Sequence, residues 1–117
     1  EGEAFAIATG LYLGGKVPAV MIQNTGMMES GDAIRGTLVG LQLPILCMIG
    51  YRGYHEMVAG HQPFDTAAVY TEPILDSWGI PHHLVDTEAD VPKISEAFKE
   101  AQDKSWPVAI LIGREYE

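Results

Sequence analysis

Cysteine and basic residues are scarce in this chain of 117 residues. Its single cysteine, Cys47, lies inside an apolar run, so no disulfide can form within the chain. A lone cysteine of this kind is typical of a core position in a protein of the reducing cytoplasm, which is the location we expect. Lysine and arginine together number 7 against 16 aspartates and glutamates, which gives a net charge of −9. This charge argues against nucleic acids and anionic membranes as partners, since both bind clustered cations.

Long apolar runs and nucleotide-binding loops are also missing. No run approaches the roughly 20 apolar residues that a membrane-spanning helix requires. Neither a Gly-x-Gly-x-x-Gly pattern nor a Walker-type loop occurs, which argues against a generic nucleotide-binding domain. The length and a hydrophobic content of 47% predict instead a single globular domain over residues 1–117.

Short apolar runs alternate with helical segments along the whole chain. Strands are predicted over residues 17–22, 45–50, 81–86 and 106–112, and helices over 1–13, 32–42, 71–78 and 90–104. The apolar runs are continuous rather than alternating, as in strands buried on both faces of a parallel sheet. The pattern therefore predicts a doubly wound α/β fold, mainly parallel, with helices on both faces. Such sheets start with a strand, so we expect the first βαβ unit to be absent from this chain.

Helix boundaries and faces follow from local signals. The first helix carries one apolar stripe at helical spacing, made of Ala4, Ile7, Ala8 and Leu11. Asp32, Thr71 and Asp90 are predicted N-caps of the three later helices, with Pro73 in the first turn of the third.

Two polar segments follow the first two predicted strands. Residues 23–32 form a glycine-containing turn, and residues 51–65 form a long loop that carries charge, aromatic rings and glycine but no periodicity. In open α/β sheets, ligands bind at the carboxyl ends of the strands, where both segments lie. A loop of this length inside a small domain is usually functional.

Three short motifs in these segments, taken together, resemble a known family. They are Glu1-Gly2, Gln23-Asn24-Thr25-Gly26 and Tyr51-Arg52-Gly53. Their order and spacing resemble the pyrimidine-binding domain of thiamine-diphosphate-dependent decarboxylases, most closely the sulfopyruvate and phosphonopyruvate decarboxylase group. The resemblance implies the thiamine-diphosphate-binding fold and decarboxylation of a 2-oxo acid that carries a second anionic group.

The resemblance also implies roles for individual residues. The glutamate that opens the first helix hydrogen-bonds a ring nitrogen of the cofactor's aminopyrimidine in that family, and Glu1 matches it. A carboxyl group at a ring nitrogen makes a strong charge-assisted hydrogen bond. Glu3 remains an alternative for this catalytic role. Asn24, Thr25 and Gly26 match the cofactor-binding turn.

Five further residues are expected at the substrate. Met27, Met28 and Glu29 stand where the family has Leu-Gly-Asn after the glycine, which changes the size and charge of the pocket wall, so the resemblance does not define the exact 2-oxo acid. Arg52 either binds the substrate's anionic group through its planar fork or makes a surface ion pair. His55 and His61 are candidate proton donors.

The magnesium site of such enzymes has no counterpart in the sequence. In the family it is a Gly-Asp-Gly followed by an Asn-Asn, and neither motif occurs here. The resemblance therefore implies that Mg²⁺ and the diphosphate are held by a partner, either a diphosphate-binding beta subunit or a homologous chain, in an oligomer. The alternative is a non-catalytic assembly or regulatory domain of the same fold.

Overall fold

Four parallel strands form one sheet at the centre of the molecule. The computed structural model describes residues 1–62 and 65–114. The strands are β1 (Ala19–Gln23), β2 (Leu46–Gly50), β3 (His82–Val85) and β4 (Val108–Ile112), in the spatial order β1-β2-β4-β3. All three pairings are parallel, which confirms the predicted sheet.

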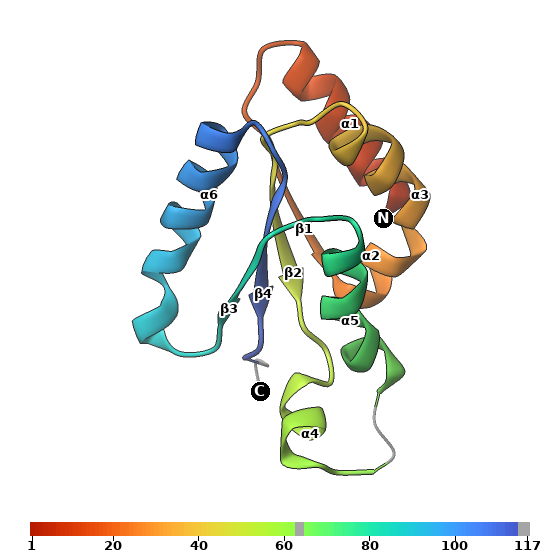
Figure 1. Ribbon diagram of the computed structural model, residues 1–117, viewed down its shortest axis with the longest axis vertical. Helices are drawn as coiled ribbons and strands as arrows, with labels where there is room; N and C mark the ends of the chain where they lie inside the picture. The colour runs from red at the N-terminus through yellow and green to blue at the C-terminus, as the bar shows by residue number, and fades with distance from the viewer. Residues whose placement is uncertain (63–64, 115–117) are drawn as a thin grey trace.

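Helices cover both faces of this sheet. Figure 1 shows α1 (Gly2–Leu13), α2 (Asn24–Glu29), α3 (Gly31–Ala33) and α5 (Thr66–Ser77) on one side and α6 (Pro92–Lys104) on the other. Each side has its own core: Phe5, Met27 and Leu38 belong to the first, and Ala97 and Ala101 of α6 belong to the second. The doubly wound fold is therefore confirmed. Within the described residues, no helix combines the length and the apolar character needed to cross a membrane.

The polar segment after β1 is helical rather than a turn. It forms α2 and α3, and a π-helical segment, η1 (Ile34–Val39), follows directly. The predicted helix over 32–42 is thus wrong in its start, and Asp32 is not its cap. Asp32 instead lies within α3 and pairs with Arg35 one turn later, at 2.7 Å.

The predicted loop over residues 51–65 contains a short helix, α4 (Tyr54–Ala59). Glycines in the left-handed conformation bound it on both sides, Gly53 with φ of 81° and Gly60 with φ of 77°. Six residues are too few to show a helical period in the sequence. Residues 63 and 64 of the predicted loop lie outside the described part of the chain.

Helix α5 starts earlier than predicted. Asp65 is its N-cap, because the Asp65 carboxylate accepts the backbone N–H of Ala67. Thr71 is therefore a buried residue in the helix interior, and Pro73 lies beyond the first turn. Proline has no N–H to donate to the carbonyl of Val69, four residues earlier, and Val69 is itself an exposed residue.

Of two further local predictions, one was right in part and the other was wrong. In the predicted stripe of α1, Ala8 is buried and Ala4 packs against the core, but Ile7 and Leu11 are exposed, and Phe5 and Thr9 complete the buried face. Asp90 does not cap α6. It closes a capping box with Thr87 around the short 3₁₀ helix η2 (Glu88–Asp90), and α6 follows it.

Candidate functional site

The carboxyl ends of the four strands meet in register at one edge of the sheet. Gln23 of β1 lies beside Gly50 of β2, Gly50 beside Ile112 of β4, and Ile112 beside Val85 of β3. The residues that follow each strand are therefore brought together, although they are far apart in the sequence. This edge is where ligands bind in parallel α/β sheets.

Glu1 lies at this edge against Gly26 in α2. A Cβ atom added at residue 26 would come within 2.7 Å of Glu1 Oε1 and 2.6 Å of Glu1 Cδ, so only glycine leaves room for the carboxyl group. Glu3, the alternative candidate, is an exposed residue in the first turn of α1. The structure therefore brings Glu1, rather than Glu3, to the predicted cofactor-binding turn.

Glu29 fixes the two helices relative to each other. Its carboxylate accepts the backbone N–H of Gly2 at 3.2 Å, which satisfies one of the free donors at the start of α1. Glu29 ends α2, and no local pattern indicated this contact, since the two residues are 27 positions apart. The contact places the first turn of α1 beside α2.

Asn24 is fully buried and holds three segments together. Its Nδ2 donates to the Arg52 carbonyl and to Thr71 Oγ1, both at 3.1 Å, and its Oδ1 accepts the backbone N–H of Thr25. Both acceptors lie on other elements, one after β2 and one in α5. The hydrogen bonds of the Asn24 side chain are thus made to other groups of the protein, and they stabilise this edge of the sheet from the interior.

The two methionines of α2 differ in their surroundings. Met27 is 0% exposed and belongs to the hydrophobic core. Met28 is half-buried and packs against the same core from outside. Of the two, only Met28 retains a surface that a small molecule can contact.

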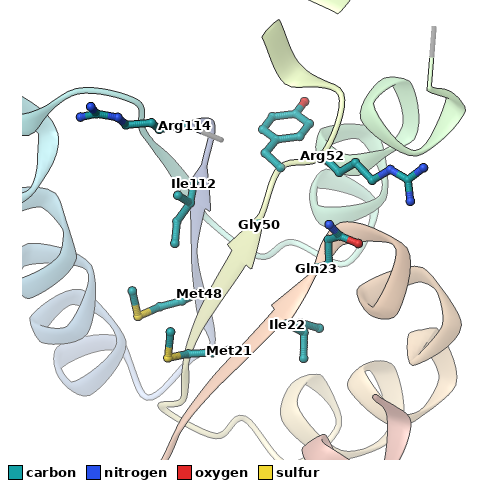
Figure 2. A pocket seen from close by; sticks show the side chains of 9 residues that line it. Met21, Ile22, Gln23, Met48, Gly50, Arg52, Ile112 and Arg114 are labelled. Carbon is teal, nitrogen blue, oxygen red and sulfur yellow. The ribbon is translucent and has the colours of Figure 1, made fainter. Parts of the chain in front are cut away.

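An open groove of about 540 Å³ runs across the sheet to the same edge. Its lining consists of Met21, Ile22, Gln23, Met48, Gly50, Tyr51, Arg52, Ile112 and Arg114. Figure 2 shows Arg52 and Arg114 extending from its rim in opposite directions. Sequence reasoning missed Arg114, although a cation directly after a buried strand was a signal that could have indicated it.

The Tyr51-Arg52-Gly53 motif organises the rim of this groove. Arg52 Nε pairs with Asp65 Oδ2 at 2.9 Å, while the Arg52 side chain stays 57% exposed. Gly53 has a positive φ of 81°, and a Cβ there would lie 2.8 Å from the Asp65 Cβ. Glycine therefore lets Asp65 approach the chain beside Arg52.

Tyr51 itself is a structural residue at the end of β2. It is 2% exposed, and its hydroxyl lies 3.1 Å from Glu72 Oε1. Burial raises the pKa of Tyr51 well above its ordinary value, and the nearby Glu72 carboxylate raises it further. The hydroxyl thus stays protonated and donates a hydrogen bond.

The two candidate histidines lie at opposite ends of α4. His55 is in the first turn, with its Nε2 2.8 Å from Asp86 Oδ1. His61 is exposed just after the helix, where its backbone N–H donates to the Glu56 carbonyl. Neither histidine is among the residues that line the groove. No pattern in the sequence linked His55 with Asp86.

Cys47 takes no part in the site. It is a buried core residue of β2, and burial raises the pKa of its thiol to about 12. The predicted packing role is confirmed.

Comparisons with known proteins identify relatives that match over nearly the whole chain. It is 31% identical over 118 aligned positions to the sulfopyruvate decarboxylase subunit alpha of Methanococcus maripaludis, covering 99% of this chain and 69% of that protein. It is 33% identical to the subunit of the same name from Methanocaldococcus jannaschii, covering 99% of this chain and 68% of that protein.

A longer protein is also similar. The sulfopyruvate decarboxylase of Methanosarcina acetivorans is 24% identical over 96% of this chain, and the matched part is 28% of that protein. No protein-family model matches the chain.

Proposed function

Because the chain belongs to the family of sulfopyruvate decarboxylase alpha subunits, we propose that it is the pyrimidine-binding half of a thiamine-diphosphate-dependent decarboxylase. Its substrate is a 2-oxo acid with a second anionic group, such as sulfopyruvate or phosphonopyruvate. The reaction breaks the bond between the carboxylate carbon and the oxo carbon, so the enzyme is a carbon–carbon lyase. Its single unpaired cysteine supports a cytoplasmic location.

The observation that carries this proposal is the contact between Glu1 and Gly26. Gly26 lacks the side chain that would displace the carboxyl group, and Glu29 holds the first turn of α1 in place. A carboxyl group fixed in this way suits the ring nitrogen of an aminopyrimidine, to which it can make a charge-assisted hydrogen bond. When bound, thiamine diphosphate supplies the carbon nucleophile and accepts the electron pair released by decarboxylation.

Other residues of the chain have supporting roles in this proposal. Asn24 and Thr25 shape the turn, Gly26 leaves the space for Glu1, and Met28 gives the wall an apolar surface. Arg52 binds the second anionic group of the substrate, because its ion pair with Asp65 uses Nε and leaves the side chain half exposed. His55 and His61 are the candidate proton donors at the outer side of the site. Met27 has no role at the substrate, since it is fully buried.

A partner subunit completes the enzyme. Within residues 1–62 and 65–114, no group of three acidic, histidine or cysteine side chains is placed to hold a metal ion. We therefore assign Mg²⁺ and the diphosphate to a beta subunit or homologous chain, with the active site shared between the two. The names of the relatives, which are alpha subunits, support this arrangement.

Calorimetry with thiamine diphosphate and Mg²⁺ tests the proposal. We expect binding when the full-length protein is mixed with its partner subunit and no binding to either chain alone. Failure of the mixture to bind, with both chains folded, would favour the non-catalytic assembly domain instead.

A substitution then tests the role of Glu1. Glu1→Gln in the full-length protein should abolish decarboxylation and slow exchange of the cofactor's C2 proton by at least 100-fold, since the hydrogen bond from the carboxyl group is lost. Glu3→Gln, two residues away and exposed, is the matched control and should leave both rates unchanged. Loss of both rates in Glu3→Gln, with wild-type rates in Glu1→Gln, would assign the catalytic role to Glu3.

A further inference from the structure

Asp86 and His55 meet at the carboxyl edge of the sheet from separate elements. Asp86 follows β3, and His55 lies in the first turn of α4, 31 residues earlier in the chain. His55 Nε2 is 2.8 Å from Asp86 Oδ1, a short contact for a hydrogen bond between nitrogen and oxygen. Figure 1 shows α4 beyond the ends of the strands, close to the end of β4.

The backbone that carries the Asp86 side chain is held by Asp90. The backbone N–H groups of Asp86 and Thr87 both donate to Asp90 Oδ2, at 3.1 and 3.0 Å. The backbone is therefore held at the peptide groups before and after the Asp86 side chain. The Asp86 side chain is 26% exposed, against 57% for His55. Asp86 is therefore the less exposed partner, on a backbone held by two hydrogen bonds, and its carboxylate is placed to orient the imidazole.

Gly113 provides the space for this arrangement. A Cβ at position 113 would lie 3.0 Å from Asp86 Oδ1 and 2.8 Å from Tyr54 Cδ1. The Tyr54 ring in turn contacts the His55 ring edge to face, with centroids 5.3 Å apart. A glycine after β4 thus lets a carboxylate and an aromatic ring close around one imidazole.

The chemistry of the pair defines the state of His55. An ionised carboxylate only accepts hydrogen bonds, so Nε2 of His55 carries the proton in this contact. Nδ1 is then the nitrogen that takes up or releases a proton, as in other histidines oriented by a carboxylate. In metal sites, a carboxylate that orients a histidine commonly contributes a factor of about 10–100 to affinity or activity, and we expect a contribution of that size here.

We propose that Asp86 is a positioning residue that orients His55 as the proton donor of the decarboxylation. The proposal rests on the function proposed above. Loss of CO₂ from a 2-oxo acid breaks one C–C bond and forms one C–H bond, so each turnover consumes one proton. His55 gives up that proton from Nδ1 and regains it from water, while Asp86 keeps the Nε2 proton in place throughout.

A double-mutant cycle on the complete enzyme, full-length chain with its partner subunit, tests the proposal. Asp86→Asn keeps the size of the side chain and removes its charge, and we expect kcat for sulfopyruvate to fall about 10–100-fold. His55→Gln should lower kcat by at least as much. The double variant should be no slower than His55→Gln alone, because Asp86 acts only through His55.

A matched control uses the other close histidine–carboxylate pair of the described chain. His83 Nε2 lies 2.7 Å from Glu100 Oε2, between β3 and α6 and away from the carboxyl edge. Glu100→Gln removes the same kind of contact and should leave kcat unchanged. A loss of kcat in this variant equal to that in Asp86→Asn would show a general structural effect and overturn the proposal.

Nuclear magnetic resonance of the ring protons gives a readout that does not depend on turnover. We expect a slowly exchanging Nε2 proton of His55, shifted far downfield, in the wild-type chain and its loss in Asp86→Ala. Absence of this signal from the folded wild type, additive losses in the cycle, or full activity of Asp86→Asn would each overturn the positioning role. These results leave the proposed function standing, whereas a wild-type enzyme without any decarboxylation overturns both.

Discussion

The Glu1 carboxyl group occupies the space that a side chain at residue 26 would need. Glu1 Oε1 would be 2.7 Å from a Cβ built on Gly26, well inside van der Waals contact. The two residues lie at the starts of different helices, so their contact couples the entry of α1 to α2. The glycine is therefore required by the glutamate, rather than by its own backbone conformation.

Gly26→Ala should displace the Glu1 carboxyl group and lower decarboxylation by about 100-fold, since small shifts of a reacting group have effects of this size. Its cost in unfolding free energy should be less than about 1 kcal/mol, because the clashing atoms belong to the half-exposed Glu1 side chain, which can move aside. Enzyme assays of the assembled protein and urea unfolding measure the two effects. Gly10→Ala is the control. Nothing lies within 4 Å of a Cβ added at residue 10, and alanine should stabilise α1 by about 0.5–1 kcal/mol. Wild-type activity in Gly26→Ala would contradict the assigned position of Glu1.

Asn24→Ala should destabilise the fold by about 2–3 kcal/mol, because it removes two buried hydrogen bonds and leaves the Arg52 carbonyl without this donor. Urea unfolding measures the change. Thr25→Ala is the comparison, since among the described residues the Thr25 hydroxyl bonds to the exposed Gln23 side chain alone, and it should change stability by less than about 0.5 kcal/mol. Equal effects of the two substitutions would show that Asn24 does not anchor the edge.

Arg52→Ala should raise KM for a substrate with two anionic groups by about 10–100-fold, the loss expected for a charge-assisted hydrogen bond. Stability should change by no more than about 1 kcal/mol, since the Arg52 side of the ion pair is 57% exposed. Arg35→Ala removes the same charge and an exposed ion pair elsewhere, with Asp32, and should leave KM unchanged. If both variants keep the wild-type KM, Arg52 makes only a surface ion pair.

Asp90 should contribute to the acid sensitivity of the fold. The Lys93 ammonium at 2.7 Å, together with the backbone N–H groups of Thr87 and Asp86, holds the pKa of Asp90 well below its usual range. The folded state therefore binds this proton less readily than the unfolded state, so the stabilisation is complete above the ordinary value of 3.8 and is lost as pH falls below it. Urea unfolding of wild type and Asp90→Asn should show a difference that is constant from pH 5 to 7 and shrinks below about pH 4. A difference that stays constant throughout would contradict this assignment.

Local signals predicted only some of the helix boundaries. Asp65 and Thr71 are both good N-caps, and the choice of Asp65 depends on tertiary contacts, since Thr71 is used inside the fold to bind Asn24. Helix α4 has six residues and no period to detect, so only its packing against the ends of the strands reveals it. The exposed Ile7 shows the same limit: helical spacing predicted the correct element and placed Ala4 and Ala8 correctly, but the buried face is rotated toward Phe5, whose ring fills the core where Ile7 was expected.

The sequence by itself determined the parallel α/β architecture and the polar segments at one edge of the sheet. Continuous apolar runs can be buried only between two layers of helices, and strands of one direction end together. Only the tertiary structure decided which side chains meet there. The contacts of Glu1 with Gly26, Arg52 with Asp65 and His55 with Asp86 join residues from different elements. Such contacts depend on the register of the sheet and on how the helices pack, and no local pattern in the sequence encodes either one.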